Sequence, residues 1–155
     1  MALFNSIEPV SIEEAINSPT VSLVMIRKRL EDGENRVRKF VAYSIMEILK
    51  FFNIGKMPST EQISMAVNHI IMDFYYLTMS DIKMVISMAQ RGMLGEIYGH
   101  IDGQTIYSWF SKYNDMRIEI GMNMTQDEHE RITASEKQTR EVYSASQHIK
   151  RTTSI

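Results

Sequence analysis

The chain has 155 residues, a mass of 18.0 kDa, and 17 basic against 19 acidic side chains. This length is sufficient for one domain with a buried core and short for two, and the net charge of −2 excludes a histone-like protein held on DNA by bulk charge. Because there is no cysteine, disulfides, zinc–thiolate sites, iron–sulfur clusters and thiol nucleophiles are excluded as well.

Targeting and membrane signals are weak throughout the sequence. The first nine residues carry no Lys or Arg, which a signal peptide needs at its start. No stretch reaches the roughly 18 apolar residues of a membrane span. We therefore expect a cytoplasmic protein with no membrane partner.

The spacing of apolar residues predicts helices along nearly the whole chain, beginning with two short ones. Ser11 is a suitable cap for a helix that ends near Asn17. Ser18 followed by Pro19 predicts the start of a second helix, because proline is tolerated in the first helical position. This second helix is expected to end near Asp32 and Gly33.

Longer helices are predicted after Gly33. A sustained i, i+3/i+4 apolar pattern predicts a third helix from about Glu34 to Ile54, with Gly55 as its left-handed stop. Capping boxes start the next two helices. These boxes are Ser59 to Gln62 and Thr78 to Asp81, and the fifth helix is expected to end at Arg91 and Gly92.

A sixth helix is predicted after a glycine-spaced connector. Asp102 is expected to cap it through the backbone N–H of Gln104 or Thr105. Trp109 lies on its apolar face and is expected to be buried. The connector glycines either give the positive φ of a tight connection or cradle phosphates through backbone N–H groups. Gly99 is expected to have positive φ, and Gly103 to lie where another part of the chain approaches closely.

These elements predict an all-α fold, a compact bundle of five to six helices with a C-terminal helical or flexible arm. The expected division is a helical bundle domain over residues 1–121 and a charged arm over residues 122–155. The arm has no Gly or Pro, so helix is permitted, but it has few large apolar residues. We therefore expect it to gain full order on a partner, and a homo-oligomer is one possibility.

Six basic residues within 13 positions form the best nucleic-acid candidate in the sequence. This basic cluster consists of Arg27, Lys28, Arg29, Arg36, Arg38 and Lys39. Such cations neutralise phosphates and release counterions. Glu31, Asp32 and Glu34 lie among them, however, so a solvated face with local ion pairs is the alternative interpretation.

Catalytic and metal-binding patterns are not evident. His129-Glu130 lacks the histidine at position 133 that a zincin needs, because that position is Thr133. His69 has apolar neighbours and is expected to be a core or boundary residue. No Ser/His/Asp order is diagnostic and no pair of carboxylates stands out as an acid–base couple. We predict no catalytic residue, no metal and no cofactor.

The 13 methionines either fill the core or form a protein-contact surface. Several lie in or beside the fourth and fifth predicted helices. Met84 and Met88 fall off the main apolar stripe of the fifth helix, and we expect them to be exposed.

A longer motif runs from Phe74 to Tyr113. It combines an aromatic-Tyr-Leu run, Arg-Gly, a Gly-x-x-Tyr loop, and Ile-Asp-Gly-Gln followed by a tryptophan. In this pattern the chain resembles an uncharacterised family of small helical proteins from Bacteroidetes and their phages and mobile elements. The residues that carry the resemblance are Tyr75, Tyr76, Leu77, Arg91, Gly92, Gly95, Tyr98, Ile101, Asp102, Gly103, Gln104, Trp109 and Tyr113.

A second, weaker resemblance is to the C-terminal module of DnaD-like primosomal proteins. It rests on the order of Tyr98, Ile106 and Trp109 after a glycine-containing loop. That family contacts single-stranded DNA and helicase, so the resemblance implies similar contacts here.

Two functional hypotheses follow. The first is a non-enzymatic accessory protein of phage or mobile-element DNA metabolism, in the host cytoplasm if phage-encoded, which binds nucleic acid weakly, a replication protein, or both. The second is a protein–protein interaction module, such as a virion or assembly component or a host-factor binder, without nucleic-acid binding. The predicted partner-binding residues are Arg91, Tyr98, Asp102, Gln104 and Trp109.

Overall fold

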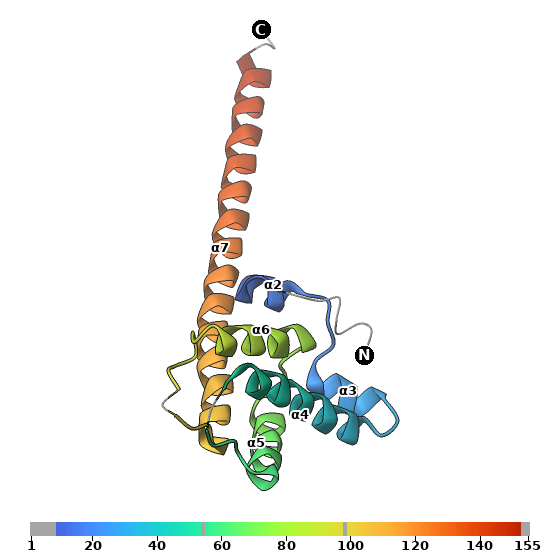
Figure 1. The fold of residues 1–155 in the computed structure, drawn as a ribbon. Helices are drawn as coiled ribbons and strands as arrows, with labels where there is room; N and C mark the ends of the chain where they lie inside the picture. Colours follow the sequence, from blue (N-terminus) through green and yellow to red (C-terminus); the bar gives the residue numbers. More distant parts are fainter. Residues whose placement is uncertain (1–8, 54, 98, 153–155) are drawn as a thin grey trace. The chain divides into compact units, whose positions relative to one another are not determined.

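The computed structural model describes residues 9–53, 55–97 and 99–152, with side chains up to Arg140. Over these residues the fold is all-α, with six helices and no strand, which confirms the predicted fold class. In chain order the helices are α2 (Ile12–Asn17), α3 (Leu23–Arg29), α4 (Gly33–Phe51), α5 (Thr60–Asp73), α6 (Met79–Gln90) and α7 (Gly103–Thr152) (Figure 1). None of the described helices is both long and apolar enough to cross a membrane.

The chain divides into two compact units, Met1–Ile118 and Glu119–Ile155. The first unit contains α2 to α6 and the first part of α7, and the second contains the rest of α7. In the second unit, every described side chain from Thr125 to Arg140 is exposed. Its hydrogen bonds are local, such as the one from the Gln126 amide to the Glu130 carboxylate at 3.1 Å.

Helix α4 is the central helix of the first unit. It packs against α3, α5 and α6, and α6 also packs against α2 (Figure 1). The buried face of α4 includes Val37, Val41, Ser44, Ile45 and Ile48, at the predicted i, i+3/i+4 spacing. Ser44 is satisfied within this face because its hydroxyl donates to the Phe40 carbonyl at 2.9 Å.

The first turns of α7 supply the largest core side chains, Trp109, Phe110 and Tyr113. Trp109 is only 2 % exposed, which confirms that it is buried. Its ring lies 6.3 Å from that of Phe52, the residue after α4. Phe110 stacks on Phe74, the residue after α5, with the ring centroids 6.3 Å apart.

The predicted helix starts at Ser11, Ser59 and Thr78 are confirmed. Each side chain accepts a hydrogen bond from a backbone N–H in the first turn of its helix. Both capping boxes are complete, because Gln62 and Asp81 each accept in return from the backbone N–H of the cap residue. These bonds satisfy N–H groups that the helix itself leaves without a partner.

The predicted start of the second helix at Pro19 is wrong, because α3 begins at Leu23 and ends at Arg29. The preceding residues are instead held against the start of α6. The Leu23 N–H donates to the Leu77 carbonyl at 2.9 Å, and the Met79 N–H donates to the Val21 carbonyl at 3.2 Å. These long-range bonds outweigh a local preference for helix.

Hydrogen bonds between hydroxyl groups also hold the segment before α3 against the start of α6. The Ser80 hydroxyl donates to that of Ser18 at 2.8 Å and accepts from that of Thr20 at 2.9 Å. Ser80 is fully buried, so these hydroxyls replace the water that it loses on folding.

The predicted helix stop at Gly55 is also wrong. Helix α4 ends at Phe51, and Phe52 is extended, so the helix stops before the glycine. Ile54, the predicted last residue of this helix, lies outside the described residues.

Three exposure predictions are corrected as well. Met84 and Met88 are 3 % and 2 % exposed, because α2 and α4 both pack against α6 and cover more than one stripe of it. His69 is exposed, since the buried face of α5 is formed by its neighbours Ala66, Val67 and Ile70.

Candidate functional site

A groove of about 460 Å³ lies between α5 and the first turns of α7, within the first unit. We call it the α5–α7 groove. Its lining residues are Gln62, Met65, Ala66, His69 and Asp73 of α5, and Asp102, Gly103, Gln104 and Tyr107 at the start of α7. Because these residues come from α5, from α7 and from the residue just before α7, the packing of α5 against the start of α7 fixes the shape of the groove.

The α5 wall is one helical face. Met65, His69 and Asp73 follow one another at intervals of four residues, and this spacing places side chains above each other on a helix. All three are exposed, and Met65 is 61 % exposed. The wall therefore offers a thioether, an imidazole and a carboxylate in succession.

Tyr107 forms the facing wall and is held in place by three neighbours. Its ring lies 5.6 Å from that of Phe74, and the His69 ring meets it edge-on at 6.3 Å. Its hydroxyl donates to the Asp73 Oδ2 at 2.9 Å. That hydrogen bond is the main cause of a raised pKa of Tyr107, because the carboxylate favours the protonated phenol.

The start of α7 lines the other end of the groove. The Asp102 Oδ1 accepts from the Thr105 backbone N–H at 2.8 Å and from the Thr105 hydroxyl at 2.9 Å. The predicted N-cap is therefore confirmed, and these bonds, the backbone one first, lower the pKa of Asp102. A Cβ on Gly103 would lie 3.2 Å from the Gln62 carbonyl oxygen, which confirms the predicted close approach.

The connector before the groove has the geometry of a tight connection. Gly92, Gly95 and Gly99 have φ values of 73°, 124° and 74°, so the prediction for Gly99 is confirmed. The Lys112 ammonium group donates to the Leu94 carbonyl at 2.8 Å and ties the connector to α7.

The five predicted partner-binding residues do not form one site. Asp102 and Gln104 line the groove. Arg91 is exposed at the end of α6, where its Nε donates to the Ser87 carbonyl at 3.2 Å. Trp109 faces the core, so the prediction that it contacts a partner is wrong for this fold. Tyr98 lies outside the described residues.

Of the nine lining residues, only Asp102 and Gln104 are among the predicted partner-binding residues, and the seven others include Met65, His69, Asp73 and Tyr107. The four-residue spacing of the first three was an available signal for a shared face. Nothing in the sequence indicated that Tyr107 would lie opposite them. In the described part of the chain, no three His, Asp or Glu side chains are arranged to hold a metal ion.

All six residues of the basic cluster are exposed, but several are already engaged. Glu34 pairs with Arg27 at 2.6 Å and with Arg38 at 3.0 Å, and Arg38 also donates to the Asn68 side chain. Arg36 donates to the Glu31 carbonyl at 3.1 Å.

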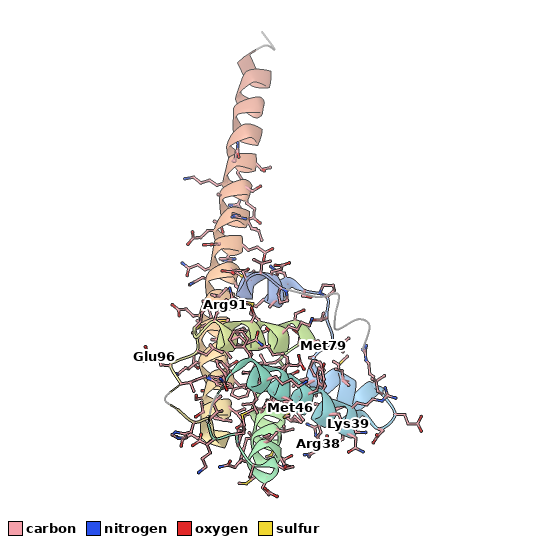
Figure 2. The ribbon with its side chains drawn as sticks, viewed as in Figure 1. Arg38, Lys39, Met46, Met79, Arg91 and Glu96 are labelled. Carbon is pink, nitrogen blue, oxygen red and sulfur yellow. The ribbon has the colours of Figure 1, made fainter. Side chains whose placement is uncertain are left out.

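The other three cations of the cluster, Lys28, Arg29 and Lys39, form no ion pair with any residue that the structure describes. Figure 2 shows Lys39 beside Arg38 on α4. The cluster thus combines internally paired side chains with available ones, so each of the two sequence-based interpretations accounts for part of it.

Both resemblances predicted from the sequence depend on motifs between Phe74 and Tyr113. Within that stretch, Asp102, Gly103 and Gln104 line the groove, whereas Trp109 and Tyr113 are buried in the core. Both resemblances stay predictions. No family model matches the chain, and no curated protein or solved structure matches it significantly.

Proposed function

We propose that this chain is a non-enzymatic protein-interaction module that binds a partner protein in the α5–α7 groove. The observation that carries the proposal is the exposure of apolar and polar side chains together on a preformed surface. Met65 is 61 % exposed at one wall, while Asp73, Asp102 and Gln104 supply polar groups. Protein-binding surfaces combine an apolar area with a few polar groups that fix orientation.

The apolar surface extends beyond the groove along α5. Met72 lies seven residues after Met65, on the same side of the helix, and is also exposed. Methionine side chains are unbranched and polarizable, so they adapt to the shape of a partner. Two exposed methionines two turns apart suit a partner that lies along α5.

Site-specific photo-crosslinking in cells of the source organism tests this function. A benzophenone amino acid replaces Met65 in one variant and Gln104 in another. The matched control replaces Met46, an exposed methionine on α4 that does not line the groove. We expect the same protein adduct from positions 65 and 104 and not from position 46. The proposal is wrong if neither groove position gives a protein adduct, or if position 46 gives the same adduct equally well.

A second candidate function is weak nucleic-acid binding by the basic cluster, as an accessory factor of DNA metabolism in the cytoplasm. The observation that favours it is the exposure of Lys28, Arg29 and Lys39 without ion pairs in the described residues. Such cations bind phosphates in a salt-dependent way. The pairing of Glu34 with two arginines lowers the charge available and limits the affinity expected.

A salt-titrated gel shift with single- and double-stranded DNA tests this second function. Replacing Lys28, Arg29 and Lys39 by Gln is expected to abolish binding. The charge-matched control replaces three exposed cations of the second unit, Arg131, Lys137 and Arg140, and should keep it. Undetectable binding of the unsubstituted chain at about 50 mM salt removes this function.

A further inference from the structure

We infer that the α5–α7 groove receives an arginine or lysine side chain of the partner protein, with its cation at Asp73. This inference deepens the proposed protein-interaction function and rests on it. It follows from the charge of the lining residues, from the hydrogen bonding of the Asp73 carboxylate, and from the α5 side chains that precede Asp73 along the groove.

The carboxylates among the lining residues give the groove a negative charge. Its nine lining residues include two carboxylates, Asp73 and Asp102, and no Lys or Arg. The two carboxylates are not equivalent. Asp102 already accepts two hydrogen bonds from Thr105 and faces the positive end of the α7 helix dipole. Asp73 is the last residue of α5, where the helix dipole adds negative charge. The most favourable position for a cation is therefore Asp73.

The Asp73 carboxylate is oriented but not saturated. Tyr107 donates to its Oδ2 at 2.9 Å, which fixes the side chain toward the groove. None of the described residues donates to Oδ1. A guanidinium or ammonium group would supply a charge-assisted hydrogen bond to that oxygen.

The neighbouring side chains suit the aliphatic stem of such a residue. His69 and Met65 lie one and two turns before Asp73 on α5, with Ala66 between them. Long basic side chains bury their methylene groups against apolar surface while the charged end stays near water. The Tyr107 ring beside Asp73 offers a face for a cation–π contact.

Other occupants fit the lining less well. A nucleic acid would bring phosphates toward two carboxylates with no lining cation to offset the repulsion. A wholly apolar helix would cover the Asp73 carboxylate without a new partner, and burial of an unpaired charge is unfavourable. The partner chemistry that matches both the apolar wall and the carboxylate is a basic side chain.

Methionine-methyl NMR on the full chain tests the inference with two synthetic probes. One is the blocked tripeptide acetyl-Ala-Arg-Ala-amide, and the other carries citrulline, a neutral isostere of arginine. We expect the arginine peptide to shift the Met65 methyl signal in a saturable way and to leave that of Met46 unchanged. The citrulline peptide should bind about fivefold more weakly, the upper end for an exposed ion pair.

Matched variants keep the test independent of folding. Asp73→Asn retains an acceptor for Tyr107 but removes the charge, and should lower binding of the arginine peptide to that of the citrulline peptide. Asp115→Asn removes an exposed charge of α7 outside the groove and should change nothing. Tyr107→Phe keeps the carboxylate and should preserve the preference for arginine.

Three results would overturn the inference. They are equal binding of the two peptides, an unchanged preference in Asp73→Asn, and a larger Met65 shift with a dT oligonucleotide than with the arginine peptide. If the peptides bind equally while positions 65 and 104 still crosslink a protein, only the cationic chemistry is wrong. If arginine is preferred but no protein crosslinks, the protein-interaction function is wrong and a cation site remains.

Discussion

The Asp81 carboxylate accepts a hydrogen bond from the Tyr113 hydroxyl at 2.6 Å, across 32 residues of chain. The same oxygen accepts from Arg117 Nε at 2.8 Å, and the other oxygen accepts from the backbone and hydroxyl of Thr78. Asp81 is fully buried, and these donors compensate for the water that it loses on folding. One carboxylate therefore both caps α6 and fastens α7 to it.

Asp81→Ala is expected to lower the free energy of unfolding by about 3 kcal/mol, because it leaves Arg117 and Tyr113 without their buried acceptor. Urea denaturation followed by circular dichroism measures the change. Asp115→Ala removes an exposed carboxylate on α7 and should stay within about 0.5 kcal/mol of the unsubstituted chain. Equal effects of the two substitutions would contradict the role given to Asp81.

The raised pKa of Tyr113 leads to a prediction for the stability of the protein at alkaline pH. Its burial, followed by the charge of Asp81, raises the pKa of Tyr113 above the usual value of about 10. The folded state therefore holds this proton more tightly than the unfolded chain does. The resulting stability is complete below about pH 10 and is lost as the pH rises toward the raised pKa of the folded state.

Tyr113→Phe removes this titration and should reduce the loss of stability between about pH 8 and pH 10.5, a window that spans the usual tyrosine pKa. Urea midpoints at the two pH values measure it. If the variant and the unsubstituted chain lose the same stability, Tyr113 is not responsible for the decline.

Gly33→Ala is expected to destabilise the turn between α3 and α4 by about 1–3 kcal/mol through overpacking. An added Cβ would lie 2.5 Å from the Ile26 carbonyl oxygen and 2.7 Å from that of Arg27. Gly55→Ala is the matched control, since its Cβ would meet nothing within 4 Å. Thermal melts of the two variants should differ clearly, and similar melting temperatures would disprove the close packing at Gly33.

Asp102→Ala should lower stability by about 1 kcal/mol, because the Thr105 N–H loses its capping acceptor. Asp102→Asn retains a capping side chain and should cost less. A thermal melt of each variant distinguishes a cap from a group that serves only recognition. An unchanged melting temperature in Asp102→Ala would show that the cap contributes nothing.

The local features of this fold could be predicted because their partners are close in sequence. The capping boxes at Ser59 and Thr78 need only a residue three positions later, and the buried stripe of α4 needs only a helical period. Residues 18–22 could not be predicted in this way. Their conformation depends on Leu77 and Ser80, and no periodicity in the sequence reports such a pairing.

The candidate site shows the same contrast between features that depend on nearby residues and features that depend on distant ones. Asp102 and Gln104 are predicted partner-binding residues because of the Ile-Asp-Gly-Gln motif, which is local in sequence, whereas the groove itself requires α5 to lie beside α7. His69 was expected in or near the core because its sequence neighbours are apolar, but those neighbours occupy the other side of α5. The exposure of Met65 and the burial of Met88 likewise depend on which helices cover each face.

The hydroxyl contacts of Ser80 also bear on the order of folding. They join residues that are 60 and 62 positions apart, whereas the capping boxes close over three. A long loop must lose its conformational entropy before such contacts form, and distant contacts slow folding. We therefore expect the segment with α2, which packs against the distant α6, to dock after α3 to α6 have assembled. In the native state the same segment would be the first to open, ahead of global unfolding.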